Sequence, residues 1–482
     1  MPGWSFRERQ ALNLTLSLGR ARIRRSVTDD ISSGGFKMRY RLVVMCALVL
    51  VFGGTALGAT LKVPSHYAAI QDAINAATPG DTVAVAAGSY LENIQLKNGV
   101  IVLGGWNAGF TQRDPSVFKT TIDGHSNGSV VVAYSPVDST SVIDGFVITN
   151  GSGTEDPMNA GTYLGGGILV YFTPGPKIMN NEIRGNVIVP NGRGGGISAH
   201  DASPVIEGNV IVENTCVAHY GFGAGINLGN CGGRVTGNYI ANNLAGGDGG
   251  GLRADGGRFS FVDNEILNNT SGINGGGLSL DHSLAYIGRN TIRDNAALSL
   301  GGGIFGYAVS STIELNVIAG NAAGADGGIC CLASPAPHIA QNTIVDNSSN
   351  EGGQIGLGEG CSPTVDHNIV ACNPSGTGLS CNWDCAPTLL CNDIWRNCRG
   401  NYAGACADQT GINGNISADP IFCSLPGGIY ALASGSPALN QECGFMGALS
   451  VSMCDSTGTP SCDCPIGVKR NSWGDIKSLY NK

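Results

Sequence analysis

Short apolar runs separated by turn residues recur along the chain from about residue 140 to about residue 400. SVIDGFVITN (residues 141–150) and GRNTIRDN (residues 288–295) are typical, with Gly, Asn, Asp or Ser between the runs. This region shows no 3.6-residue hydrophobic period of useful length. The pattern therefore predicts short β-strands joined by tight turns.

An Asn-x-apolar-x-x-Asn motif recurs through the same region at a nearly constant spacing. Its nine copies begin at Asn181, Asn209, Asn238, Asn264, Asn290, Asn316, Asn342, Asn368 and Asn392. Successive copies are 28, 29, 26, 26, 26, 26, 26 and 24 residues apart. This regular spacing indicates an internal structural repeat.

A glycine element, typically GGGI, repeats in phase with the asparagines. It places an aliphatic residue at Ile168, Ile197, Ile226, Leu252, Leu278, Ile304, Ile329 and Ile355. A phosphate-binding glycine loop occurs once, beside a strand and a helix, so eight copies at a fixed period exclude that function. The glycines mark one corner of the repeat.

A strand-and-turn unit of about 26 residues predicts a solenoid. Each strand would stack on its equivalent in the next coil, about 4.8 Å away, and form parallel sheets. The recurring asparagine suits a turn, where its amide can bond the main chain and the equivalent asparagine one coil away. We therefore predict an all-β parallel solenoid with a core of stacked aliphatic residues.

The segment before the repeats resembles the N-terminal signature of right-handed parallel β-helix proteins of the pectin lyase-like superfamily. It reads VPSHYAAIQDAINAATPGDTVAVAAGSYLENIQL (residues 63–96). The family's short capping helix matches residues 70–77, with Ser65 as a candidate N-cap. Its Pro-Gly-Asp turn matches residues 79–81, and its Gly-x-Tyr-x-Glu step matches residues 88–92.

The repeats are also similar to those of bacterial polymorphic outer-membrane proteins, which are surface adhesins. The two resemblances together cover about residues 61–445 and imply a right-handed parallel β-helix. They leave the function open, because the superfamily contains lyases, hydrolases, esterases, epimerases and adhesins.

The N-terminal region predicts export. Residues 1–37 are rich in arginine and are interpreted as a non-native upstream extension. Residues 38–59 have the basic start, apolar run and small residues of a signal peptide. The alternative is a genuine basic extension before an uncleaved anchor, although the apolar run is too short for a comfortable membrane span. We expect a secreted or cell-surface protein, with no transmembrane span in the mature chain.

The rest of the chain divides into two parts. We expect the β-helix over residues 60–450, with a capping helix within 60–78 and Cys-rich closing coils at 400–450 that cap the open sheet edges. Residues 451–482 are expected to be a Cys-containing linker followed by a short amphipathic tail. That tail is either a sorting or anchoring signal or a terminal helix.

Charge and cysteine content narrow the possible partners. Residues 61–482 carry 18 basic and 33 acidic residues, a net charge of −15, which disfavours nucleic-acid binding.

Of the 17 cysteines, all but Cys46 follow the signal peptide, and an even number in an exported chain favours disulfides. Plausible pairs are Cys216 with Cys231 and Cys381 with Cys391. The alternative is a zinc site formed by Cys381, Cys385, Cys391 and Cys398.

Stacking the coils brings two aspartates together. Three residues after the aliphatic position lie Tyr171, His200, Gly229, Asp255, Asp281, Tyr307, Leu332 and Gly358. Carboxylates of Asp255 and Asp281 in adjacent coils, about 5 Å apart, could share a proton as acid and base or bind Ca²⁺. The alternative is that they are solvated turn residues.

The candidate site residues fall into two groups, a catalytic set and a binding set. Asp255, Asp281 and Arg253 form the catalytic set, since a lyase needs a base and a cation or arginine that neutralises a uronate. His200, His282 and Tyr307 form the binding set, and Ca²⁺ is the only cofactor considered. The lyase and hydrolase motifs of the superfamily are not evident in the sequence.

The sequence favours a monomeric, exported, non-catalytic scaffold for surface adhesion or glycan binding. The alternative is a polysaccharide lyase or glycoside hydrolase that acts on an acidic polysaccharide.

Overall fold

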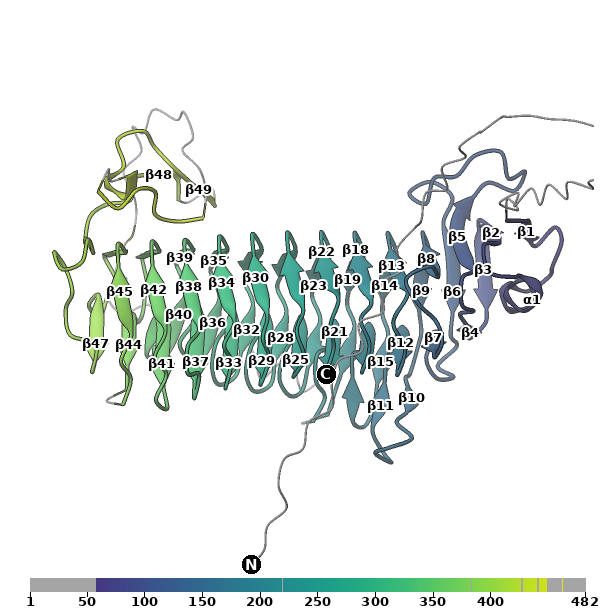
Figure 1. Cartoon of the computed structure of the whole chain (residues 1–482), viewed down its shortest axis with the longest axis horizontal. Helices are drawn as coiled ribbons and strands as arrows, with labels where there is room; N and C mark the ends of the chain where they lie inside the picture. The colour runs from purple at the N-terminus through teal and green to yellow at the C-terminus, as the bar shows by residue number, and fades with distance from the viewer. Residues whose placement is uncertain are drawn as a thin grey trace, which may run out of the picture. The chain divides into compact units, whose positions relative to one another are not determined.

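The computed structural model describes residues 58–218, 220–382, 384–425, 428–439, 442–448 and 462. The predicted upstream extension, nearly all of the signal peptide, and the linker and tail apart from Cys462 lie outside these residues. The described chain is built almost entirely of short strands that stack coil upon coil (Figure 1). The predicted all-β parallel β-helix is confirmed.

Four parallel sheets form the walls of the solenoid. Sheet 1 consists of β1 (Thr60–Val63), β2 (Thr82–Ala86), β5 (Ile101–Trp106), β8 (Val142–Asp144), β13 (Lys177–Met179), β18 (Val205–Glu207), β22 (Arg234–Thr236), β26 (Ser260–Val262), β30 (Tyr286–Gly288), β34 (Thr312–Glu314), β38 (His338–Ala340), β42 (Thr364–Asp366) and β45 (Thr388–Leu390). Sheet 2 consists of β3 (Gly88–Leu91), β6 (Thr120–Asp123), β9 (Val147–Thr149), β14 (Glu182–Arg184), β19 (Val210–Val212), β23 (Tyr239–Ala241), β27 (Glu265–Leu267), β31 (Thr291–Arg293), β35 (Val317–Ala319), β39 (Thr343–Val345), β43 (Ile369–Ala371) and β46 (Asp393–Trp395).

The other two walls complete each coil. Sheet 3 consists of β4 (Ile94–Gln95), β7 (Val131–Tyr134), β12 (Ile168–Tyr171), β17 (Ile197–His200), β21 (Ile226–Gly229), β25 (Leu252–Asp255), β29 (Leu278–Asp281), β33 (Ile304–Tyr307), β37 (Ile329–Leu332), β41 (Gly353–Gly358), β44 (Thr377–Cys381) and β47 (Tyr402–Gly404). Sheet 4 is short and consists of β15 (Val187–Ile188), β20 (Thr215–Cys216), β24 (Leu244–Ala245), β28 (Thr270–Ser271), β32 (Ala296–Ala297), β36 (Ala322–Ala325) and β40 (Ser348–Glu351). From β13 to β41 the chain passes through sheets 1, 2, 4 and 3 in that order, and then starts the next coil. Three strands stand apart as a small side sheet: β10 (Thr154–Glu155), β11 (Tyr163–Leu164) and β16 (Gly192–Arg193).

Stacked aliphatic side chains form the core. In sheet 2 the middle residue of successive strands points inward and is fully buried, as in Ile266, Ile292 and Ile318. The central residues of sheet 1, such as Ile287 and Ile313, meet them in the same cluster. Burial of each such side chain contributes roughly 1.5–3 kcal/mol. No single coil could exclude water from these residues, so the coils stabilise one another.

Two buried asparagine ladders run along the turns on either side of sheet 2. In a typical rung, Asn264 donates from Nδ2 to Oδ1 of Asn290 at 3.0 Å and to the carbonyl oxygen of Val235 at 3.0 Å. Its main-chain nitrogen donates to the same Oδ1 at 2.9 Å. The second ladder contains Asn295, which donates to Asn321 in the next coil at 3.0 Å. The predicted stacking of equivalent asparagines is therefore confirmed.

The glycine element forms the corner before sheet 3. Gly301 has φ = +63°, a conformation that glycine adopts without steric cost. A Cβ on Gly303 would lie 2.7 Å from the carbonyl oxygen of Gly328 in the next coil. The corner thus needs one glycine for its conformation and another for close approach of the coils.

A short helix, α1 (Ile70–Ala76), covers the first coil, as the N-terminal resemblance implied. It follows β1 and is shorter than the segment 60–78 that contains it. The predicted N-cap, Ser65, is wrong, because the helix starts five residues later. Instead the carboxylate of Glu92 accepts hydrogen bonds from the main-chain nitrogens of Ile70 and Gln71, at 2.9 and 3.0 Å.

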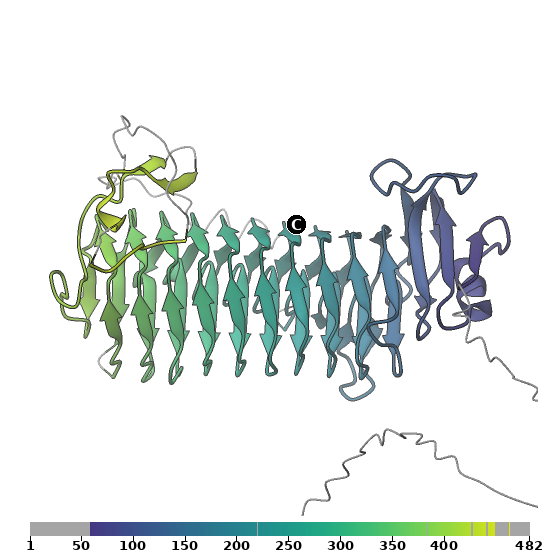
Figure 2. The same ribbon diagram turned by 45° about the horizontal axis from the view of Figure 1, so that its top comes forward.

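After β47 the chain stacks once more on the last coil, where Asn415 extends the ladder from Asn392 and Ile416 pairs with Asp393, and it then turns back along the outside of the solenoid. Strands β48 (Phe422–Ser424) and β49 (Ile429–Leu432) pair antiparallel, and a 3-10 helix, η1 (Pro437–Leu439), follows them. Apolar residues of this C-terminal segment (residues 419–448) pack on outward side chains of sheet 2, including Val317, Val345 and Ile369. Figure 2 shows the segment over the last coils. Within the expected closing region of residues 400–450, Asn415 and Ile416 thus stack on the last coil, whereas the C-terminal segment covers a sheet face.

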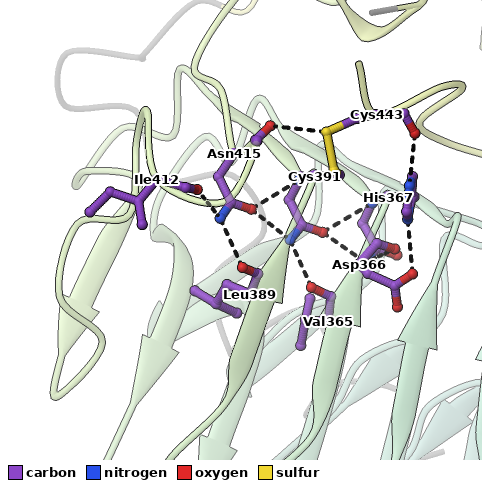
Figure 3. The surroundings of a disulfide bond; sticks show 11 residues. Val365, Asp366, His367, Leu389, Cys391, Ile412, Asn415 and Cys443 are labelled. Carbon is purple, nitrogen blue, oxygen red and sulfur yellow. Dashed lines mark hydrogen bonds and ion pairs between the residues drawn. A yellow bond between two sulfur atoms is a disulfide. The ribbon is translucent and has the colours of Figure 1, made fainter. Parts of the chain in front are cut away.

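Disulfides hold these last coils and the C-terminal segment together. Cys381 bonds to Cys406 in the next coil, and Cys372 bonds to Cys462. Cys391 bonds to Cys443 of the C-terminal segment. Beside that bond, His367 bridges the carboxylate of Asp366 and the carbonyl oxygen of Cys443, both at 2.9 Å (Figure 3).

Both predicted cysteine pairs are wrong. Cys216 and Cys231 are buried thiols, and Cys381 and Cys391 have other partners. The reason is that cysteines close in sequence lie on different walls of one coil, whereas contacts form between coils. The alternative zinc site is not formed either, because Cys381, Cys391 and Cys398 are disulfide-bonded.

Candidate functional site

The last outward residue of each sheet 3 strand and the turn residue after it form a continuous row, here named the turn row. From β12 to β33 its members are Tyr171, Phe172, His200, Asp201, Gly229, Asn230, Asp255, Gly256, Asp281, His282, Tyr307 and Ala308. Strand pairing aligns the first residue of each pair directly with its equivalent one coil away. The second residue has a positive φ, so the chain turns sharply at each step.

Asp255 and Asp281 are direct neighbours in this row, as the sequence register predicted. Their side chains are 45% and 33% exposed. Arg253 points to the same face, because residues two apart on a strand share a side. One of its guanidinium nitrogens lies 3.1 Å from a carboxylate oxygen of Asp255 and 3.8 Å from one of Asp281. The two carboxylates therefore share one cation.

Arg253 is itself held below the surface. Only 9% of the residue is exposed, and its guanidinium carbon lies 4.7 Å from the ring centroid of Phe222. It also acts on Asp248 in the loop before β25: burial raises the pKa of the Asp248 carboxyl, while Arg253 opposes that rise. The guanidinium thus supports several carboxylates from beneath and presents little surface to a ligand.

His282 joins the acidic end of the row. Its Nδ1 lies 2.6 Å from a carboxylate oxygen of Asp281, and its ring meets Tyr307 edge-on with centroids 5.8 Å apart. Oxygen or nitrogen atoms of Asp255, Asp281 and His282 all lie within 4.8 Å of one another, so they are the candidate cation ligands. The neighbouring guanidinium weakens the attraction of this group for a second cation.

Aromatic rings gather at the other end of the row. The rings of Tyr171 and Phe172 meet edge-on at 4.6 Å, and His200 lies 5.7 and 5.6 Å from them. The hydroxyl of Tyr171 donates to Asp156 at 2.9 Å. Burial and this carboxylate raise the pKa of Tyr171 to about 12, so the hydroxyl remains a donor at neutral pH.

A shallow hollow of about 420 Å³ adjoins these rings. Its lining combines an exposed aromatic ring, a carboxylate, an amide and small residues from three successive coils: Phe172, Thr173, Pro174, Asp201, Ala202, Ser203, Asn230 and Gly232. Phe172 is 43% exposed. The hollow thus offers one stacking face and several hydrogen-bonding groups.

Residues 166–348 match the family model described as a right-handed β-helix region. The protein is a right-handed parallel β-helix. This agrees with its N-terminal resemblance to pectin lyase-like proteins, while the match itself assigns no activity. No curated protein and no solved structure matched the chain in the other two comparisons.

None of the helices in the described ranges is long and apolar enough to cross a membrane. The disulfides Cys372–Cys462, Cys381–Cys406 and Cys391–Cys443 fit an oxidising, extracellular environment.

The sequence register predicted residues at both ends of the turn row, with Asp255 and Asp281 at one end and His200 at the other, but it did not predict the hollow. That register rests on residues three places after the GGGI aliphatic. The hollow depends on the next position, where Phe172, Asp201 and Asn230 have left-handed backbones. Comparing that position across coils would have shown the succession of an aromatic, an acidic and an amide residue.

Proposed function

We propose that this β-helix is an exported, non-catalytic scaffold that binds a glycan along the turn row. The observation that carries the proposal is the hollow beside Phe172, where an exposed ring adjoins the carboxylate of Asp201 and the amide of Asn230. A sugar ring offers an apolar face to an aromatic side chain and hydroxyls to polar groups around it. These are the groups that the hollow combines.

The geometry of the coils supports a polymeric ligand. Equivalent positions recur about every 4.8 Å along stacked parallel strands. That spacing is close to the length of one sugar ring, so successive units of a chain can meet successive coils. Gly229 has no side chain of its own, and the ring of His200 lies beside it, since a Cβ there would be 2.8 Å from Cδ2 of His200.

The position of Arg253 favours binding without chemistry. A lyase uses an accessible cation to neutralise the uronate carboxylate while a base removes a proton. Arg253 is mostly buried and already serves Asp255 and Asp281. The second candidate remains a polysaccharide lyase or hydrolase, favoured by the convergence of these three residues on one face.

Binding tests the proposal directly. We expect the purified protein to bind at least one member of a panel of neutral, amino-sugar and uronate polysaccharides. Phe172→Asn removes the ring but suits the left-handed turn, and we expect it to weaken binding about tenfold by loss of stacking. Phe172→Tyr keeps the ring and should bind like the parent.

The alternative is tested with the same polymers. Incubation with uronate polysaccharides, followed by the absorbance of unsaturated product, should give no signal with or without Ca²⁺. A product that forms only with Ca²⁺ and is lost in Asp281→Asn would replace the scaffold proposal with the lyase. Failure to bind any polymer of the panel would refute glycan binding. Sedimentation of the same sample tests the expected monomer.

A further inference from the structure

Two buried thiols face each other between successive coils near the C-terminal end. Cys331 is the third residue of β37, and Cys361 lies in the turn after β41, one coil further on. Both belong to the solenoid core and are fully buried. Their thiols are hydrogen-bonded to each other.

A similar strand-to-turn contact occurs in a bonded form at Cys381–Cys406. Strand pairing places Cys331 opposite Leu357 and Leu357 opposite Cys381, so the two cysteines occupy equivalent positions two coils apart. Cys406 lies two residues past Gly404, which pairs with Cys381, and Cys361 lies four residues past Leu357, which pairs with Cys331. In both cases a strand residue meets the turn of the next coil. The bonded pair has a Cα–Cα distance of 5.2 Å.

We infer that Cys331 and Cys361 form a further disulfide, which joins the coil of β37 to the coil of β41. The inference rests only on the export part of the proposed function, because the bond requires an oxidising compartment. It extends the covalent links of the last coils toward the middle of the solenoid.

The oxidant is the disulfide of an oxidised thiol–disulfide oxidoreductase or of oxidised glutathione. The thiolate of Cys361 attacks one of its sulfurs, and the other sulfur leaves as a thiolate. The thiolate of Cys331 then attacks Cys361 in the mixed disulfide and displaces the second oxidant sulfur. The two protons of the cysteines pass through solvent to the departing thiolates, and the oxidant gains two electrons. Because both thiols are buried in the finished coil, the oxidant reaches Cys361 while the turn after β41 opens locally and the two coils stay in register.

Cys361 is suited to the first attack. The hydrogen bond from Cys331 is the main cause that lowers the pKa of the Cys361 thiol, whereas burial opposes it. The pKa of Cys331 is raised by that hydrogen bond and by burial. Cys361 therefore ionises first and Cys331 resolves the mixed disulfide.

Two other thiols are the possible competitors. Cys385 occupies the turn one coil beyond Cys361 and is partly exposed. Cys330 is adjacent to Cys331, but it points to the outer side of the strand, where it bonds the buried carboxylate of Asp326. Neither repeats the strand-to-turn contact of Cys381 with Cys406.

Non-reducing peptide mapping distinguishes these pairings. Residues 294–395 contain no Lys or Arg, so trypsin leaves Cys331 and Cys361 in one fragment. A protease that cleaves after Asp and Glu separates them into fragments 327–346 and 360–366. We expect the exported, full-length protein, alkylated in denaturant before digestion, to give these two fragments as one linked species. Reduction should separate them.

Single substitutions assign the sulfur atoms. Cys331→Ala should leave Cys361 open to alkylation, whereas Cys330→Ala, the matched control, should leave the linked species unchanged. The inference is wrong if fragment 360–366 is recovered alkylated, or linked to fragment 385–393, while Cys391 and Cys443 are found oxidised in the same digest. That internal reference separates a failure of this inference from a failure of export.

Discussion

The side-chain nitrogen of Asn347 donates to Oε1 of Gln354 at 2.9 Å, where other rungs of its ladder meet an asparagine of the next coil. Gln354 then donates from Nε2 to Oδ1 of Asn397 at 2.9 Å. Asn373, the expected next rung, turns its own Nδ2 to the carbonyl oxygen of Thr377. Gln354 therefore carries the ladder across an irregular coil.

Loss of this glutamine should destabilise the solenoid more than loss of an exposed amide. Gln354→Ala leaves the buried amides of Asn347 and Asn397 short of a partner, and we expect a loss of about 2–4 kcal/mol in the free energy of unfolding. Asn350→Ala, on the exposed part of β40, is the matched control and should change it by less than about 0.5 kcal/mol. Urea denaturation followed by circular dichroism measures both. Equal midpoints for the two variants would contradict a role for Gln354 in the ladder.

The asparagine ladder shows which features could be predicted from the sequence alone and which could not. The nine asparagine copies have a nearly constant spacing, so the period predicted both the coil and the stacking of Asn264 on Asn290. Gln354 stands in the glycine element, and only the three-dimensional path brings it to the place of Asn373. Periodicity thus reveals positions that are alike in each coil and misses a side chain that crosses from one column to another.

Only some features of the candidate site and of the disulfides could be predicted from the repeat pattern. Asp255 and Asp281 were predicted as neighbours because both hold the same position in their coils. The partners of Cys381 and Cys391 were missed, because those contacts depend on how turns and the C-terminal segment approach particular coils. The burial of Arg253 against Phe222 depends on a loop that the repeat pattern does not place.

Asp393 makes stability depend on pH. It is fully buried, accepts from the main-chain nitrogen of Ala418 at 3.0 Å, and has no partner for Oδ2 among the described residues. Burial raises its pKa from 3.8 to about 7. The folded protein therefore holds a proton that the unfolded chain releases, and the free energy of unfolding falls as pH rises from about 4 to about 7.

Asp393→Asn removes the free-energy cost of ionising this buried carboxyl group above pH 7. We expect the variant to match the parent near pH 4 and to exceed it at pH 8 by up to about 4 kcal/mol, from about three pKa units. Denaturation midpoints across this pH range provide the test. Asp408→Asn is the control of opposite sign, because hydrogen bonds from Thr410 lower the pKa of the exposed Asp408 carboxyl. A constant difference between Asp393→Asn and the parent at all pH values would contradict the assignment.

Arg253 should matter for stability. Arg253→Met keeps most of the packing on Phe222 but leaves Asp255 and Asp281 without their shared cation. Because both carboxylates are partly exposed, we expect a loss of only about 1–2 kcal/mol. Arg258→Met, at an exposed position nearby, should have no measurable effect. The two are compared by urea denaturation at low and high salt, and the effect of Arg253→Met should shrink as salt increases.

The Cys391–Cys443 bond should hold the C-terminal segment on sheet 2. Cys443→Ser should lower stability by about 2–4 kcal/mol and increase proteolysis within residues 419–448. Binding of a hydrophobic dye should rise as Val345 and Ile369 become exposed. Cys385→Ser, which changes a thiol outside the described disulfides, should leave both readouts unchanged. If proteolysis of Cys443→Ser stays at the parental level, the remaining disulfides and the apolar contacts retain the segment without this bond.

The uniform coil between Asn238 and Asn342 has a consequence for the length of the protein. Four successive repeats there have the same length of 26 residues, and each pairs with the repeats before and after it. The gene could therefore lose or gain one such unit, and the strands on either side would still meet in register. Deletion of residues 264–289 would bring Asp255 beside Tyr307. It would also place Tyr307 one coil closer to the aromatic end of the row. Whole-unit duplication and deletion are thus a simple route by which a solenoid of this kind can adjust the span between two binding groups without redesigning either.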